Sequence, residues 1–125
     1  MNKGTIALIL LALVSNAHAA DKKTALTGDQ LKSEFVGKTW RLVWTDGKQS
    51  QPGSQTLAAD GTTTVLMDSG YKDEGTWTIK GDLLCSTFKK VPKSVCSPIY
   101  SIDGGKFLWI GTTPEKKGQS TTFSQ

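Results

Sequence analysis

The chain has 125 residues, with 15 lysines and arginines against 11 aspartates and glutamates, and a formal net charge of +4. This length suits one domain with a single core. The positive charge is mild and dispersed, so the composition does not indicate a nucleic-acid-binding protein. The one lysine cluster, Lys89, Lys90 and Lys93, is typical of a solvated hairpin tip.

The first 19 residues have the pattern of a secretory signal peptide. Lys3 precedes an apolar run over residues 6–14, and Ala17 and Ala19 form an A-x-A cleavage site. The apolar run is too short for a membrane span, which needs roughly 20 residues. The sequence therefore predicts cleavage after Ala19, a periplasmic or secreted location, and one soluble domain over residues 20–125.

The first predicted element of this domain is a short amphipathic helix. Asp29 is a suitable N-cap, and Leu31 and Phe35 lie four positions apart, so they share one helix face. Gly37 suits the end of the helix, which then leads into the first strand.

Residues 39–44 predict that first strand, because polar and apolar side chains alternate along it. Trp40, Leu42 and Trp44 fall on one face. We expect this face to point into the core.

A hairpin is predicted further along the chain. Asp60-Gly61 suits a two-residue type I′ turn between arms at residues 55–59 and 62–67. Polar segments rich in glycine predict the surrounding turns and loops, which are residues 46–47, 48–54 and 68–74.

The centre of the chain predicts an antiparallel meander. Gly81-Asp82 suits a tight turn between strands at residues 75–80 and 83–88. Trp77 and Ile79 share a face of the first of these strands, which predicts that Trp77 is in the core. Further strands are predicted at residues 95–102, 106–110 and 119–123.

The two cysteines predict a disulfide. Antiparallel pairing of residues 83–88 with 95–102 brings Cys85 opposite Cys96. An exported protein folds in an oxidising compartment, where such a pair is usually a structural bridge. The spacing also misses the short C-x-x-C pattern of redox and zinc sites.

These elements indicate an all-β protein, namely a small antiparallel meander barrel of seven or eight strands with one short N-terminal helix. Closure removes the exposed sheet edges, and a barrel of this size is either filled by side chains or holds one small ligand. A two-sheet sandwich is the alternative.

At Phe35, Gly37 and Trp40, a short helix runs into a strand that carries a tryptophan. This arrangement resembles the opening of lipocalin-like, or calycin, barrels. The mature chain is also similar to a group of small exported bacterial proteins of unknown function. The shared motifs are Gly37-Lys38-Thr39, Asp60-Gly61, Gly75-Thr76-Trp77, Gly81-Asp82-Leu83-Leu84-Cys85 and Cys96. The first resemblance implies the barrel architecture, and the second implies no activity.

A local resemblance concerns Ser69-Gly70-Tyr71 with Lys72. It is similar to the loop that periplasmic inhibitors present to the acidic cleft of lysozyme, although here the tyrosine directly follows the glycine. The resemblance implies partner-binding roles for Ser69, Tyr71 and Lys72.

Catalytic chemistry is sparse. The only histidine, His18, lies in the predicted signal peptide, so the mature chain lacks the central residue of most nucleophilic and acid–base sites. Asp68, Asp73 and Glu74 share one predicted loop, and paired carboxylates can act in hydrolysis. Acidic residues beside glycine are also ordinary in turns, so we predict no catalytic residue, cofactor or metal.

The sequence therefore predicts a non-enzymatic exported barrel that binds a small apolar ligand or a protein partner. Lysozyme inhibition through residues 69–72 is one alternative, and a carboxylate-dependent hydrolase is another. Tyr71 is the aromatic residue that packing explains least, so we expect it to contact a partner.

Overall fold

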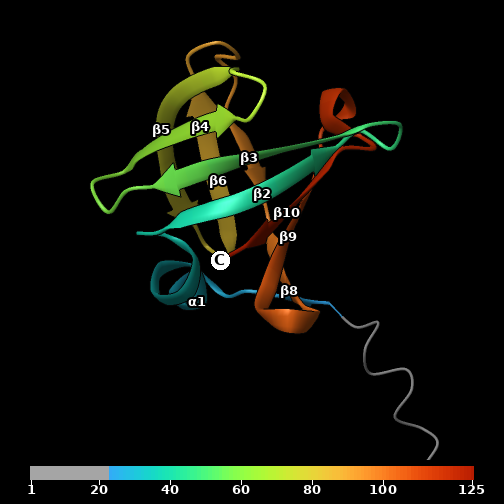
Figure 1. The fold of residues 1–125 in the computed structure, drawn as a ribbon. Coiled ribbons are helices and arrows are strands. Elements are labelled where there is room, and N and C mark those ends of the chain that lie inside the picture. The colour runs from blue at the N-terminus through green and yellow to red at the C-terminus, as the bar shows by residue number, and fades with distance from the viewer. Residues whose placement is uncertain (1–22) are drawn as a thin grey trace, which may run out of the picture.

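The computed structural model describes residues 23–125, so the predicted signal peptide and its cleavage site lie outside the described residues. The described residues form ten strands and one short helix, most of which are labelled in Figure 1. The strands are β1 (Thr24–Ala25), β2 (Thr39–Thr45), β3 (Ser50–Leu57), β4 (Thr62–Met67), β5 (Lys72–Lys80), β6 (Leu83–Phe88), β7 (Val95–Ser97), β8 (Ile99–Ile102), β9 (Lys106–Ile110) and β10 (Ser120–Ser124). The helix α1 (Gly28–Gln30) continues into a π-helical turn, η2 (Leu31–Phe35), and two 3-10 turns are η3 (Asp103–Gly105) and η4 (Pro114–Lys116).

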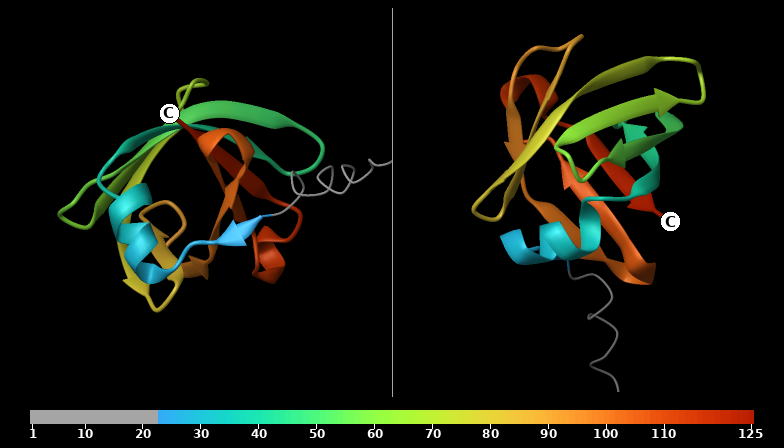
Figure 2. Two further views of the ribbon diagram at one scale, coloured as in Figure 1. Left: turned by 90° about the horizontal axis from the view of Figure 1, so that it is seen from below. Right: turned by 90° about the vertical axis from the view of Figure 1, so that its left-hand side faces the viewer.

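All ten strands belong to one antiparallel sheet, in the order β1-β8-β9-β10-β2-β3-β4-β5-β6-β7. Figure 2 shows that this sheet curls round on itself. Residues 95–102 form one segment interrupted at Pro98, where β7 pairs with β6 and β8 pairs with β9. This segment therefore links the two ends of the curled sheet, and the predicted all-β meander barrel is confirmed. It has two more strand segments than the eight expected, because Pro98, which has no N–H, divides one of them and because β1 forms before the helix.

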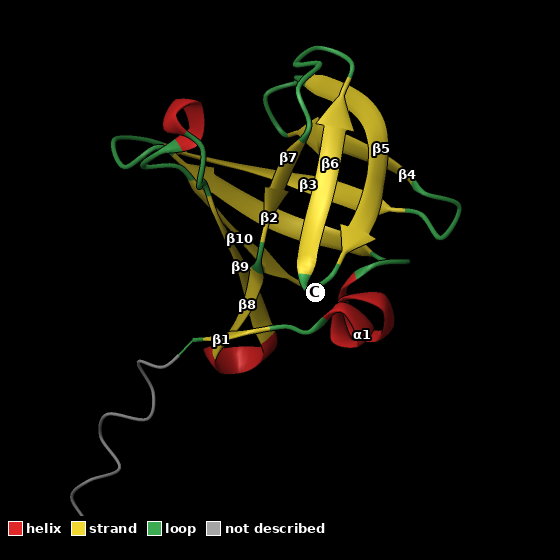
Figure 3. Cartoon of the chain, turned by 180° about the vertical axis from the view of Figure 1, so that it is seen from behind, coloured by secondary structure: helices red, strands yellow, loops and turns green. Residues whose placement is uncertain are grey.

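The helix covers one end of the curled sheet, which we call the floor (Figures 2 and 3). Phe35 and Trp40 are buried and stack with their ring centroids 5.3 Å apart. Phe107 and Phe123 meet Phe35 edge-on, and the Trp40 indole N–H donates to the Phe35 carbonyl at 2.8 Å. Leu42 is buried beside them. The core positions predicted at Trp40 and Leu42 are confirmed, whereas Trp44 is only partly buried.

The N-cap of the helix is Thr27, so the prediction of Asp29 was wrong. The Thr27 hydroxyl accepts from the Gln30 N–H, and the Gln30 side chain accepts from the Thr27 N–H, which satisfies two otherwise unpaired donors. The Gly28 N–H donates to Asp82 Oδ1 at 2.7 Å. A Cβ at Gly28 would collide with the Gly81 carbonyl oxygen, so this position needs glycine. These contacts fasten the helix to the turn between β5 and β6.

The predicted loop over residues 48–54 was wrong, because most of it lies in β3. The Pro52 carbonyl accepts from the Asp68 N–H at 3.0 Å, beyond the end of β4. The nitrogen of Pro52, which carries no hydrogen, also faces the β4 side, so the pairing of β3 with β2 loses no hydrogen bond. At Gly53, a Cβ would lie 2.6 Å from the Met67 Sδ, so glycine allows β3 and β4 to approach closely.

Two turns differ from the sequence prediction. The hairpin between β3 and β4 has three residues between Ala58 and Thr62, rather than a two-residue type I′ turn. The same pattern recurs between Met67 and Tyr71, where the Met67 N–H donates to the Tyr71 carbonyl. The predicted loop over residues 68–74 is therefore a short turn, and Lys72 already begins β5.

The disulfide prediction is confirmed. Cys85 on β6 and Cys96 on β7 are directly opposite each other and are bonded. Trp77 is partly buried, packs against the core, and donates its indole N–H to the Ala58 carbonyl at 2.8 Å.

Candidate functional site

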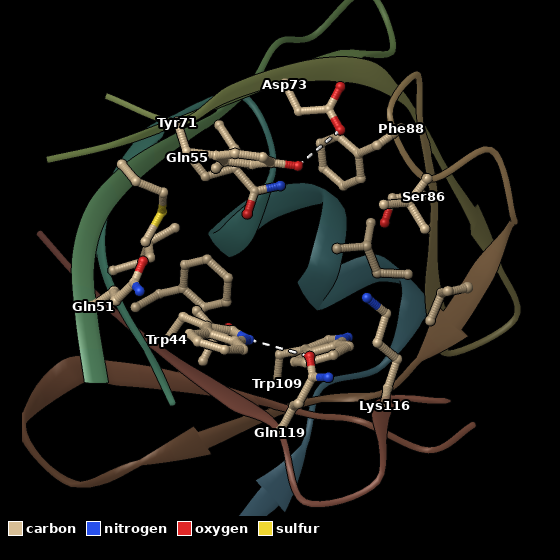
Figure 4. A pocket seen from close by; sticks show the side chains of 18 of the residues that line it. Trp44, Gln51, Gln55, Tyr71, Asp73, Ser86, Phe88, Trp109, Lys116 and Gln119 are labelled. Carbon is tan, nitrogen blue, oxygen red and sulfur yellow. Dashed lines mark hydrogen bonds between the residues drawn. The ribbon is translucent and has the colours of Figure 1, made fainter. Parts of the chain in front are cut away.

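A cavity of about 530 Å³ lies inside the curled sheet. Its lining runs from Phe35 at the floor to loop residues at the opposite end, such as Gln49, Val91 and Lys116. We call this opposite end, where β2 joins β3, β4 joins β5, β6 joins β7 and β9 joins β10, the mouth. Figure 4 looks into the cavity and shows the strands surrounding it.

The cavity lining changes character from the floor to the mouth. The residues nearest the floor are apolar, and they are Phe35, Leu42, Leu84, Ile99 and Phe123. Towards the mouth the lining gains polar side chains, which are Gln49, Gln51, Asp73, Ser86, Lys93, Lys116 and Gln119. The remaining glutamine, Gln55, is directly opposite the floor residue Trp40. The cavity can therefore surround the apolar part of a small molecule and still offer polar contacts at its entrance.

Two tryptophans form one wall of the cavity near the mouth. Thr121 on β10 is directly opposite Trp44 on β2 and also opposite Trp109 on β9, so the three side chains form one row. Figure 4 shows both indoles facing the interior. The Trp44 N–H donates to Gln119 Oε1 at 3.2 Å, which fixes the orientation of that amide. We call Trp44, Thr121 and Trp109 the tryptophan wall.

Asp73 lies on the opposite wall and is 5% exposed. Its carboxylate accepts from the Glu74 N–H at 2.8 Å, and the Lys90 N–H lies 3.2 Å from each of its oxygens. The Tyr71 hydroxyl also donates to it at 3.4 Å. Backbone and phenolic donors therefore stabilise this buried charge without an ion pair.

Tyr71 stands at the rim of the mouth and is 46% exposed. Partial burial raises the pKa of its phenol, and the charge of Asp73 raises this pKa further. The Lys90 ammonium lies 4.8 Å from the centre of the ring, a cation–π contact. Tyr71, Asp73 and Lys90 thus connect the turn before β5 to the loop between β6 and β7.

The structure separates the three predicted partner-binding residues. Ser69 is exposed on the turn between β4 and β5, and Tyr71 lines the cavity mouth. Lys72 is exposed on the outer face of β5, because the side chain of the next residue, Asp73, points inward. The three residues are neighbours in sequence, but Tyr71 and Lys72 belong to different surfaces.

The three carboxylates that were candidates for hydrolysis do not converge on one point. Asp68 pairs with Arg41 at 3.1 Å on the surface, whereas Asp73 points inward. Glu74 pairs with Lys89 at 2.9 Å, and a hydrogen bond from that ammonium lowers the pKa of Glu74. Within residues 23–125 there is no group of three or more histidine, cysteine, aspartate or glutamate side chains that could hold a metal ion.

Sequence reasoning did not identify the polar lining of the cavity. Gln51 and Gln55 share the inward face of β3 with Leu57, and alternation would have shown this if residues 50–54 had been recognised as strand. Gln119 shares the inward alternation of Thr121 and Phe123, which the predicted strand over residues 119–123 already contained. Lys116 belongs to the connection between β9 and β10, where no periodic pattern indicates direction.

Comparisons of the chain with protein-family models, with curated proteins and with solved structures find no match. Among the described residues, no helix has the length and apolar character needed to cross a membrane.

Proposed function

We propose that this protein is an exported, non-enzymatic β-barrel that binds a small, largely apolar ligand inside the curled sheet. The observation that supports this best is the cavity of about 530 Å³, with its apolar floor and its tryptophan wall. Small-molecule sites are typically concave and mostly apolar, with volumes of roughly 300–1,000 Å³.

Two further observations support the proposal. The Cys85–Cys96 disulfide is consistent with folding in an oxidising compartment, as the predicted signal peptide requires. The resemblance to lipocalin-like barrels, through Phe35 and Trp40, agrees with the aromatic floor beneath the cavity. Both observations support the proposal that the mature protein is periplasmic or secreted.

A neutral apolar dye, N-phenyl-1-naphthylamine, tests the proposal by fluorescence titration. Ser86 lines the cavity, so Ser86→Phe should fill it and weaken dye binding about tenfold or more. Thr87 does not line the cavity, so Thr87→Phe is the matched control and should bind like the wild type. Absence of saturable dye binding to the wild type, or equal effects of both variants, would refute the proposal.

Protein binding at the mouth is the second candidate, because Tyr71 exposes 46% of its surface at the rim. Inhibition of a c-type lysozyme is the specific form that the Ser69–Lys72 motif suggests. Lys72→Ala separates the two candidates, since Lys72 lies outside the cavity. A loss of lysozyme inhibition without a change in dye binding would favour the protein partner, whereas no inhibition by the wild type would exclude the lysozyme form.

A further inference from the structure

Lys116 is held at the cavity mouth by its own backbone. The Gln119 N–H donates to the Lys116 carbonyl at 2.9 Å, and the Gly111 N–H donates to the Gln119 carbonyl at 2.9 Å. A Cβ at Gly111 would collide with the Lys116 carbonyl oxygen, so the connection between β9 and β10 folds tightly back on Gly111. Figure 4 shows the Lys116 side chain reaching over the cavity beside Trp109.

The charge of Lys116 has no partner among the side chains that the structure describes. Among the described residues, its ammonium makes no ion pair, side-chain hydrogen bond or cation–π contact. The side chain is partly buried and lines a cavity whose deeper part is apolar. A cation in such a place favours an anionic group on whatever enters the cavity.

Among the described lining residues the one carboxylate, Asp73, is on the opposite wall and already accepts several hydrogen bonds. Two backbone N–H groups and the Tyr71 hydroxyl donate to it, so little of its accepting capacity remains. A cationic ligand group would have to compete with these donors. The described lining therefore favours a negative ligand group at Lys116 over a positive one at Asp73.

We propose that the ligand is an anionic amphiphile, whose head group contacts the Lys116 ammonium at the mouth and whose apolar tail passes the tryptophan wall to the floor. This inference rests on the proposed function and specifies its ligand class. The polarity of the lining supports this orientation, because polar side chains lie towards the mouth and the apolar residues Leu84, Ile99 and Phe123 lie deep. Carboxylate and phosphate heads share the chemistry that Lys116 recognises.

Four dodecyl compounds with the same tail test the head group. Dodecanoate, dodecyl phosphate, dodecanol and dodecyltrimethylammonium are titrated below their micelle concentrations, by calorimetry and by displacement of N-phenyl-1-naphthylamine. Both anions should bind about tenfold or more tightly than dodecanol, and the cation should bind most weakly. Tighter binding of the phosphate would indicate a phospholipid-like source, and tighter binding of the carboxylate a fatty acid.

Lys116→Gln should remove the advantage of the anions, so that dodecanoate and dodecyl phosphate bind this variant about as tightly as dodecanol does. Lys117→Gln is the matched control, because Lys117 is exposed and does not line the cavity. Retention of the anion preference in Lys116→Gln, or equal binding of dodecanol and dodecanoate to the wild type, would overturn this inference but leave the proposed function standing. Failure of all four compounds and of the dye to bind would refute the proposed function itself.

Discussion

At the scale of single residues, Asp73 is the side chain with the most distinct structural role. Its buried carboxylate joins the start of β5, the Tyr71 ring and the loop after β6 through four hydrogen-bond contacts. Such a group stabilises the fold only while its donors remain in place, since an unpaired charge in this environment is costly.

Asp73→Ala should therefore lower the free energy of unfolding by about 1–3 kcal/mol, because it leaves the Lys90 N–H without its partner in a partly buried site. Urea unfolding measures this loss. Asp68→Ala is the control, since Asp68 forms an exposed pair with Arg41, and such pairs contribute about 0–1 kcal/mol. Equal losses for the two variants would show that Asp73 does not hold the loop.

At the scale of elements, acidic side chains stabilise several turns, and their titration should make the stability depend on pH. Hydrogen bonds from the Gln49 and Lys48 N–H groups lower the pKa of Asp46, and those from the Thr62 hydroxyl and N–H lower that of Asp60. A lowered native pKa means that the stabilisation is complete above the unfolded-state pKa and is lost as the pH falls through the native value.

We therefore expect the free energy of unfolding to be constant from neutral pH to about 5 and to fall below about pH 4. Urea unfolding across this range measures the decline. Replacing Asp46 and Asp60 together by asparagine, which still offers an acceptor oxygen, should make the decline shallower. An unchanged decline in the double variant would mean that other carboxylates control the acid response.

Alternation along the strands predicted most of the elements. Trp40 and Leu42 were correctly placed in the core because one face of β2 is apolar, and the register of Cys85 and Cys96 followed from one hairpin. The strand over residues 50–54 was predicted as a loop because proline and glycine usually interrupt strands, and Pro52 and Gly53 lie within it. Here the proline lies where β3 extends beyond β4, and the glycine allows a close approach to Met67.

The candidate site was only partly predictable, because a cavity depends on the whole barrel. Tyr71 was singled out from its loop, and the structure places it at the mouth. Lys116 was missed, since its direction depends on a turn that folds back on Gly111. The sequence allowed both a filled barrel and one that holds a ligand, because the space that remains depends on how the helix and the strands pack their inward side chains together.

At the scale of the whole molecule, closure of the barrel depends on residues 95–102. β7 pairs with β6 through three residues, and β8 pairs with β9 through four, whereas β2 and β3 share seven pairs. The Ser97 and Thr112 hydroxyls, 3.3 Å apart, add a side-chain contact between β7 and the segment after β9. At this junction, formed by residues 95–102 and their partners in β6 and β9, the strands share fewer pairs than the five to seven that join β10, β2, β3, β4, β5 and β6 in turn.

The disulfide lies at this junction, and its removal should affect the junction more than the rest of the barrel. Cys85→Ala with Cys96→Ala should lower the free energy of unfolding by about 3 kcal/mol, as expected for a closed loop of this length. Most of such an effect can arise in the unfolded chain, so unfolding experiments alone do not test the junction. Hydrogen exchange of the native protein, under conditions where amides exchange by local opening, tests the junction directly.

In the double alanine variant, the amides of β7 should exchange faster by a larger factor than those of β2 and β3, because three backbone pairs alone would then hold β7 to β6. Dye binding should weaken in parallel, since Val95 on β7 lines the cavity. A uniform rise in exchange across all strands would show instead that the disulfide acts only by destabilising the unfolded chain. The Pro98 segment and the contact between the Ser97 and Thr112 hydroxyls, rather than the covalent bond, would then keep the junction closed.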